Sequence, residues 1–341
     1  MRDVPVRDPP VFRPRAARWH VRPALVAAAG LAAFLALAGL SVVAPLPMGT
    51  PPPFASAALA PRQVAERAVR AEETTRRGHD LLRHAKAQVL GGATSGDRSG
   101  LVGQELTPLV TTLGSLEAKK LSTSPAWARV LTERLAAEGI GPGSVVAASL
   151  SGSFPGLNLA LAAACQALDA RLVAVSSVTA SAWGANEPGF TWPEMEARLV
   201  EAGVIAAVSV AVTAGGGSDR ADDLAPEDRE LAERIRDAAA TRLSVAALRP
   251  ATFDEAVAAR VRAYRRAAAG APIALYANVG GADASLGRSP AILGLGAGFV
   301  HGPRLDRGPG GGVTAWFAAQ RVPILMLLNV RELAVRWGIG L

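Results

Sequence analysis

Short apolar runs alternate with longer helical patterns from Gly143 to the end of the chain. The runs are apolar at nearly every position, which is typical of strands covered on both faces and therefore of a mostly parallel sheet. The pattern predicts strands over residues 144–150, 172–178, 204–212, 243–248, 273–279 and 322–328. It predicts helices over residues 157–169, 192–202, 226–240, 253–269 and 331–337. We therefore expect a three-layer α/β fold in which helices flank a mostly parallel sheet.

The first sixty residues have a different pattern. Residues 1–22 carry six arginines against two aspartates, which is typical of a solvated basic tail. No charged residue occurs over residues 23–46, and about twenty apolar helical residues cross a bilayer core of about 30 Å. We expect one transmembrane helix over 23–46, with a cytoplasmic N-terminus because the arginines precede it. The Pro/Ala-rich residues 47–60 then form a linker to an extracytoplasmic domain over 61–341.

A cleaved signal peptide is the alternative for the apolar segment. Small residues at 55–57 and 58–60 resemble cleavage sites. They lie beyond several prolines, however, and the apolar stretch is longer than the usual core of a signal peptide. An uncleaved anchor, and a single-pass protein of the cell membrane, is therefore the favoured interpretation.

Residues 61–90 are predicted to form a helix rich in basic side chains. Such a helix suits a position near anionic lipid headgroups. An ordinary solvated helix face explains the same residues equally well.

Charge and composition narrow the chemistry. The net charge of +7 allows an anion-binding surface without requiring one. The single cysteine, Cys165, has no partner for an intramolecular disulfide and is expected to be a small core residue. Histidines and cysteines form no spaced cluster, so we expect no metal and no cofactor. Neither a phosphate-binding Gly-Lys-Ser/Thr loop nor a three-glycine dinucleotide motif is present, and no nucleic-acid partner is expected.

The candidate site lies in loops that follow predicted strands. In an open parallel sheet, ligands bind outside the carboxyl ends of the strands. The loops there are rich in glycine and hydroxyl side chains, so one crevice can collect them. The candidate ligand-binding residues are Ser151, Gly152, Ser153, Gly156, Asn158, Gly215, Gly216, Gly217, Gly280 and Gly281, together with Lys119.

The turn "SGSFPG" has two interpretations. Its entry into a helix leaves the amides around Gly156, Leu157 and Asn158 unpaired, and these amides attract a carboxylate or phosphate. Alternatively, it is a tight turn whose serines cap the helix.

Catalysis requires a base for a serine of this turn. Ser153 followed by Asp219 and His301 matches the chain order of a hydrolase triad, but the Gly-x-Ser-x-Gly motif is absent. The candidate catalytic pair is Ser153 and His301. A serine–lysine arrangement using Lys119 or Lys120 is also conceivable, although no Ser-x-x-Lys spacing surrounds them.

Two further segments each have two interpretations. Residues 111–125 either present cations and hydroxyls to a polyanion or form a helix with a Ser/Thr cap. Residues 183–196 place Trp183, Phe190 and Trp192 before a helix, where aromatic rings either anchor a partner or staple the loop to the core.

Five segments in the same order resemble the poly-γ-glutamate system protein family. They are "GLVGQELTPLVTTLGSLEAKKLSTSP", "SGSFPGLNLA", "SSVTASAWGANEPGFTWPEME", "AGGGSDR" and "NVGGADASLG". The anchor followed by one outer domain also looks like that family. The resemblance covers most of the outer domain but not the basic tail or the linker.

The resemblance implies a role in making and exporting poly-γ-glutamate beside a ligase and multispanning membrane proteins. One hypothesis is an accessory protein that binds this polymer, or another carboxylate-bearing ligand, or scaffolds the complex. The other is an extracytoplasmic serine amide hydrolase or transferase that trims or releases the polymer.

Overall fold

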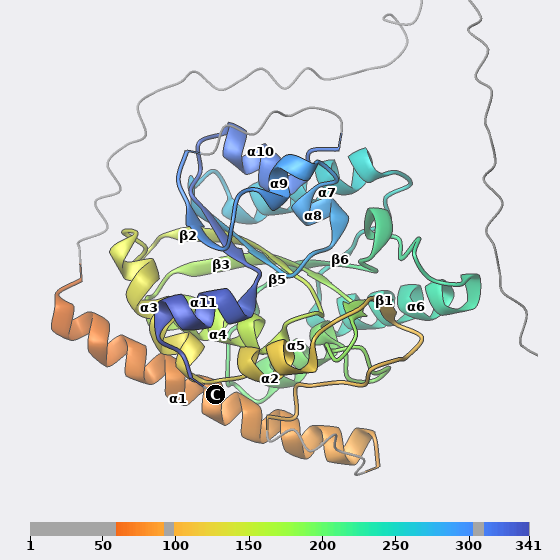
Figure 1. Ribbon diagram of the computed structural model, residues 1–341, viewed down its shortest axis with the longest axis horizontal. Coiled ribbons are helices and arrows are strands. Elements are labelled where there is room, and N and C mark those ends of the chain that lie inside the picture. Colours follow the sequence, from red (N-terminus) through yellow and green to blue (C-terminus); the bar gives the residue numbers. More distant parts are fainter. Residues whose placement is uncertain (1–58, 92–98, 303–309, 341) are drawn as a thin grey trace, which may run out of the picture. The chain divides into compact units, whose positions relative to one another are not determined.

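The computed structural model describes residues 59–91, 99–302 and 310–340, all within the compact unit Pro53–Leu341. Seven of its strands form one sheet, in the order β6-β5-β3-β2-β7-β9-β8 (Figure 1). These strands are β2 (Val145–Leu150), β3 (Arg171–Ser177), β5 (Ser209–Thr213), β6 (Ala246–Ala247), β7 (Ile273–Val279), β8 (Gly298–Val300) and β9 (Ile324–Leu327). Every neighbouring pair is parallel except β8 with β9. The predicted α/β fold with a mostly parallel sheet is confirmed.

Alternate residues of each strand enter two different cores, which is why the strand runs are apolar throughout. Val146 and Ala148 face the core covered by α3 (Ala126–Ala137), α4 (Pro155–Ala167), α5 (Trp192–Glu201) and α11 (Val330–Trp337). Val145 and Ala147 face the core covered by α7 (Phe253–Ala268) and α10 (Val313–Ala319). The layers are visible in Figure 1, and α6 (Pro226–Leu243) packs on β5 and α5.

The long helix α1 (Pro61–Val89) packs outside α3 and α4. Its inner face is made of small residues such as Ala68, Ala71 and Gly78. A Cβ on Gly78 would lie 2.8 Å from a methyl group of Leu159, so glycine allows this close approach. α1 is therefore an integral part of the domain, with charged side chains along its outer face.

Smaller elements surround the carboxyl edge of the sheet. Strand β1 (Val110–Thr112) pairs parallel with β4 (Ala180–Ser181), and α2 (Leu116–Ser122) follows β1. The Oγ of Ser115 accepts a hydrogen bond from Ala118 N at 3.3 Å, so segment 111–125 does contain a capped helix. The remaining elements are the short helix η1 (Gly217–Asp219), α8 (Asp283–Leu286) and α9 (Pro290–Leu293).

Most predicted elements are present, with local differences. The strand predicted over 204–212 begins only at Ser209, and the one predicted over 243–248 is reduced to Ala246–Ala247 because α6 continues to Leu243. Phe190 and Trp192 are fully buried, which confirms that they staple their loop to the core. Cys165 is buried as expected, and burial raises the pKa of its thiol to about 12.

The predicted tail, the apolar segment 23–46 and nearly all of linker 47–60 lie outside the described residues. Within the three described ranges, every helix is too short or too polar to cross a bilayer.

Candidate functional site

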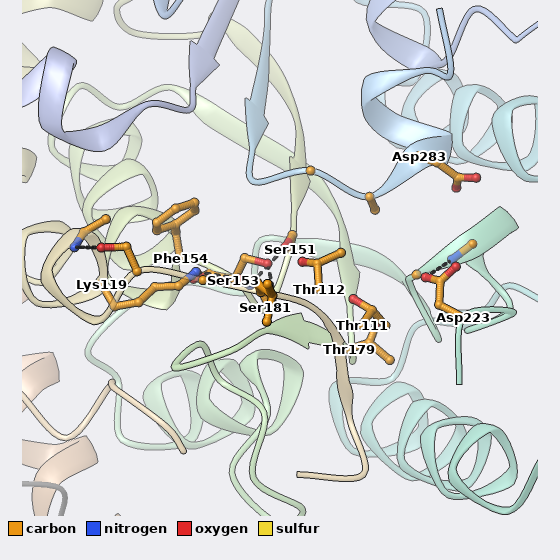
Figure 2. A pocket seen from close by; sticks show the side chains of 18 residues that line it. Thr111, Thr112, Lys119, Ser151, Ser153, Phe154, Thr179, Ser181, Asp223 and Asp283 are labelled. Atoms are coloured by element: carbon orange, nitrogen blue, oxygen red, sulfur yellow. Dashed lines mark hydrogen bonds between the residues drawn. The ribbon is translucent and has the colours of Figure 1, made fainter. Parts of the chain in front are cut away.

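A cleft of about 500 Å³ lies at the carboxyl edge of the sheet, where the strand order reverses (Figure 2). From β2 the chain proceeds to β3, β5 and β6 on one side and then returns to β7 on the other. The segments after β2 and β7 therefore lead to opposite faces of the sheet, which is the arrangement that opens a ligand crevice in doubly wound sheets. Among the lining residues, hydroxyl side chains are prominent: Thr111, Thr112, Ser115, Ser151, Ser153, Thr179 and Ser181.

Lys119 forms one wall of this cleft. Its side chain is 3% exposed, and Nζ donates hydrogen bonds to the backbone oxygen of Ser153 and, at 2.7 Å, to Ser181 Oγ. The same nitrogen lies 3.8 Å from the centre of the Phe154 ring. Burial lowers the pKa of Lys119 from 10.5 to about 7, because a charged amine loses its hydration there. Lys119 can therefore exchange a proton near neutral pH.

The serine turn after β2 is held by its own hydrogen bonds. Ser151 Oγ accepts from Ser153 N at 2.9 Å, and Ser151 O accepts from Asn158 Nδ2 at 2.9 Å. Ser153 Oγ in turn accepts from Ser181 N at 3.0 Å. These bonds fix two loops against each other, so Ser153 and Ser181 have defined positions beside Lys119.

Close backbone approach explains the glycine that follows β7. Gly280 has φ +82°, and a Cβ at this position would lie 2.7 Å from Ser151 Oγ. A larger residue there would displace the serine turn.

The opposite end of the cleft is acidic (Figure 2). Asp223 accepts a hydrogen bond from Gly217 N at 2.8 Å, and Asp283 accepts from Ser218 N at 2.9 Å. Asp283 also pairs with Arg288 at 2.7 Å. The cleft thus joins a lysine-and-serine end to a carboxylate end.

A buried ion pair joins α7 to η1 and also contacts strands β2 and β3. Arg260 is fully buried and donates to Asp219 at 2.5 and 2.7 Å, and its other donors reach the hydroxyls of Ser149 and Ser177 at 3.1 and 3.0 Å. Asp219 is committed to this pair. It therefore does not serve as the third member of a catalytic triad.

The sequence-predicted residues separate into two groups. Ser151, Ser153, Lys119, Gly216, Gly217 and Gly281 line the cleft. Gly152, Gly156, Asn158, Gly215 and Gly280 lie in the loops and the helix that back it.

The first turn of α4 has neither the side-chain cap nor the full set of unpaired amides that the two interpretations of this turn assumed. A Cβ on Gly156 would lie 2.4 Å from the backbone oxygen of Ser122, so this first turn packs against the end of α2. The amide of Asn158 already donates to Phe154 O at 3.1 Å. The cleft is instead lined by side-chain hydroxyls and Lys119.

The structure does not bring Ser153 and His301 together. Val300 pairs with Ile324 at the start of β9, so His301 follows β8 at the amino edge of the parallel strands. Its Nε2 lies 2.6 Å from Glu138 Oε2, next to the end of α3. Ser153 follows β2 at the opposite, carboxyl edge. His301 therefore cannot act as the base for Ser153, and this pairing is corrected.

Several lining residues were not in the sequence-derived candidate set, and the two that contact Lys119 Nζ through their side chains are Ser181 and Phe154. Ser181 comes next to Lys119 through the pairing of β1 with β4, which joins segments about seventy residues apart. The hydroxyl-rich run Thr179–Ser181 after a predicted strand is the signal that pointed toward this loop.

Within the described ranges, no three His, Cys, Asp or Glu side chains are grouped so that they could hold a metal ion. No protein-family model, curated protein or solved structure matches this chain. The function is therefore inferred from the residues of the cleft and from the sequence segments quoted above.

Proposed function

We propose that this protein is a membrane-anchored accessory component of poly-γ-glutamate synthesis or export that binds the carboxylate-bearing polymer in the cleft. The observation that carries the proposal is Lys119, an amine set among hydroxyl donors at the switch point of the sheet. A carboxylate beside Nζ would favour its ammonium form and accept charge-assisted hydrogen bonds. The segment resemblance supplies the identity of the polymer.

The rest of the cleft suits a polyamide better than a simple anion. A γ-linked glutamate chain offers amide N–H and C=O groups between its carboxylates. The hydroxyls along the cleft can donate to and accept from those amides. Asp223 and Asp283 can accept from amide or amine N–H groups and repel a second carboxylate, so they would set the register of the chain.

The anchor is proposed on sequence grounds. Residues 23–46 carry no charge and follow an arginine-rich tail. Both features favour a single span with the N-terminus in the cytoplasm and the described domain outside.

Calorimetric titration of the full chain with poly-γ-glutamate tests the binding site. We expect Lys119→Met to weaken binding about tenfold or more, because a charge-assisted hydrogen bond contributes about 1.5–3 kcal/mol. Lys120→Met is the matched control, because Lys120 is the adjacent residue of α2 and is exposed. Wild-type affinity should also fall as pH rises above about 7, where Lys119 loses its proton.

Equal affinities for wild type and Lys119→Met would contradict the proposed site. Equal binding of poly-γ-glutamate and poly-α-glutamate would show that only the polymer's charge is recognised.

A further inference from the structure

The contact between Lys119 and Ser181 pairs an amine with a hydroxyl, an arrangement that ligand binding alone does not require. Nζ lies 2.7 Å from Ser181 Oγ, and both residues line the cleft. Both are buried, Ser181 at 7% and Lys119 at 3% exposure. A serine hydroxyl within hydrogen-bond distance of a buried amine at the wall of a ligand cavity has the arrangement of a serine nucleophile with its base.

Among the described residues, no counter-ion contacts Nζ. Its partners there are neutral: the backbone oxygen of Ser153, the hydroxyl of Ser181 and the ring of Phe154. The nearby charges on α2 and α11, Glu117 and Arg331, pair with each other at the exposed surface, and Lys120 is itself exposed. The acidic residues of the cleft, Asp223 and Asp283, lie at its other end (Figure 2). The lowered pKa of Lys119 has burial as its cause.

We propose that Ser181 is a nucleophile and Lys119 its general base, and that together they transfer an acyl group from an amide or ester held in the cleft. The proposal rests on the proposed function only for its natural substrate, the γ-glutamyl amide bond. The serine–lysine pair itself is argued from the geometry of the cleft.

The reaction balances with water as the second substrate. Ser181 Oγ bonds to the acyl carbon as its proton passes to the neutral amine of Lys119. The resulting ammonium gives this proton to the leaving nitrogen when the C–N bond breaks, which leaves an ester on Ser181 and releases an amine. Water then attacks the ester and gives a proton back through Lys119, which frees the carboxylic acid and restores Ser181. An acceptor amine in place of water would give transfer instead of hydrolysis.

Ser153 has a positioning role in this arrangement. Its Oγ accepts from the backbone N–H of Ser181 at 3.0 Å and has no contact with Nζ among the described hydrogen bonds. It therefore fixes the loop that carries the nucleophile without exchanging a proton with Lys119. This difference separates the two serines experimentally.

The test is covalent labelling of the full chain with a fluorophosphonate, followed by intact-mass measurement and peptide mapping. We expect one adduct, at Ser181, formed as fluoride leaves. Ser181→Ala should abolish it, and Lys119→Met should slow it about 100-fold or more, as expected for loss of a general base. Ser153→Ala should be labelled at the same residue, Ser181, but more slowly, because the loop that carries Ser181 loses a hydrogen bond. In the wild type the labelling rate should rise with pH through a midpoint near 7, and this measurement needs no variant.

An adduct on Ser153, or labelling of Ser181 that is insensitive to both Lys119→Met and pH, would overturn the proposal. If the chain binds poly-γ-glutamate but is not labelled, Ser181 is not a nucleophile, and the proposed binding function still stands. If Ser181 is labelled in a chain that does not bind this polymer, the serine–lysine pair is supported and the proposed function is contradicted. Circular dichroism melts of each variant confirm that the labelled protein is folded.

Discussion

Lys119 is the residue on which the chemistry of the cleft depends. Lys119 is 3% exposed, and within the described part of the chain its amine contacts neutral acceptors and an aromatic ring but no carboxylate. Its ammonium form is therefore disfavoured in the folded state, and the pKa of about 7 expresses that cost. The same cost makes the amine available as a base at neutral pH.

This burial has a consequence for stability. Because the folded-state pKa of Lys119 lies below its unfolded value, the unfolded chain binds more protons between about pH 7 and 10. The free energy of unfolding of the wild type should therefore rise with pH in this window relative to Lys119→Met, by at most about 1.4 kcal/mol per pH unit. Urea unfolding of both proteins across the window measures this difference, since other groups titrate alike in both. A constant difference would show that Lys119 keeps its ordinary pKa.

For single residues, the sequence predicted which residues belong to the site better than it predicted which of them contact each other. Ser151 and Ser153 were named from residue type and position after a strand, and Lys119 from the segment 111–125 rich in cations and hydroxyls; all three line the cleft. The Lys119–Ser181 contact joins positions 62 residues apart, and no local spacing encodes such a contact. His301 was chosen because it completes the chain order of a hydrolase triad, and chain order says nothing about position in the fold.

In helix α1, one of the basic residues is buried and attaches the helix to the rest of the domain. Its sequence was interpreted as an exposed basic helix, and periodicity fixed its length well. Lys86, however, lies inside, 2% exposed, with Nζ 2.5 Å from Glu187 and 2.6 Å from the backbone oxygen of Val102. A basic residue can thus dock a helix when a buried carboxylate far along the chain receives it. Composition alone does not distinguish such a residue from its exposed neighbours.

The Lys86–Glu187 pair should be important for stability even though ion pairs on surfaces contribute little. Glu187→Gln leaves a buried ammonium without its counter-ion, and we expect a loss of about 3 kcal/mol or more. Glu201→Gln is the comparison, because Glu201 pairs with Arg242 at 2.6 Å where the two side chains are 53% and 38% exposed. The loss for this variant should stay below about 1 kcal/mol. Urea denaturation measures both. Similar losses for the two variants would mean that α1 is not held by this pair.

At the scale of the whole molecule, strand direction decides which predictions succeeded. Near-continuous apolar runs predicted parallel strands, and parallel strands bring their following loops to one edge, where the cleft is found. The antiparallel strand β8 was not predicted, because its three residues are too few to show a period. Its reversed direction carries His301 to the other edge and separates it from every serine of the cleft.

The division of the chain at Pro52/Pro53 gives a prediction for the whole protein. Residues 23–46 would span about 36 Å as a helix, enough for a bilayer core of about 30 Å. We expect the full chain to stay with membranes after a high-salt or alkaline wash, and a chain beginning at Pro53 to be released. The released chain should keep the unfolding midpoint of the full chain, because the core side chains of the described residues all follow Pro53. Arg→Gln changes throughout residues 1–22 are the control, since they remove electrostatic attraction to lipid but leave the apolar segment. Release by those changes alone would show that the basic tail, and not a spanning helix, holds the protein at the membrane.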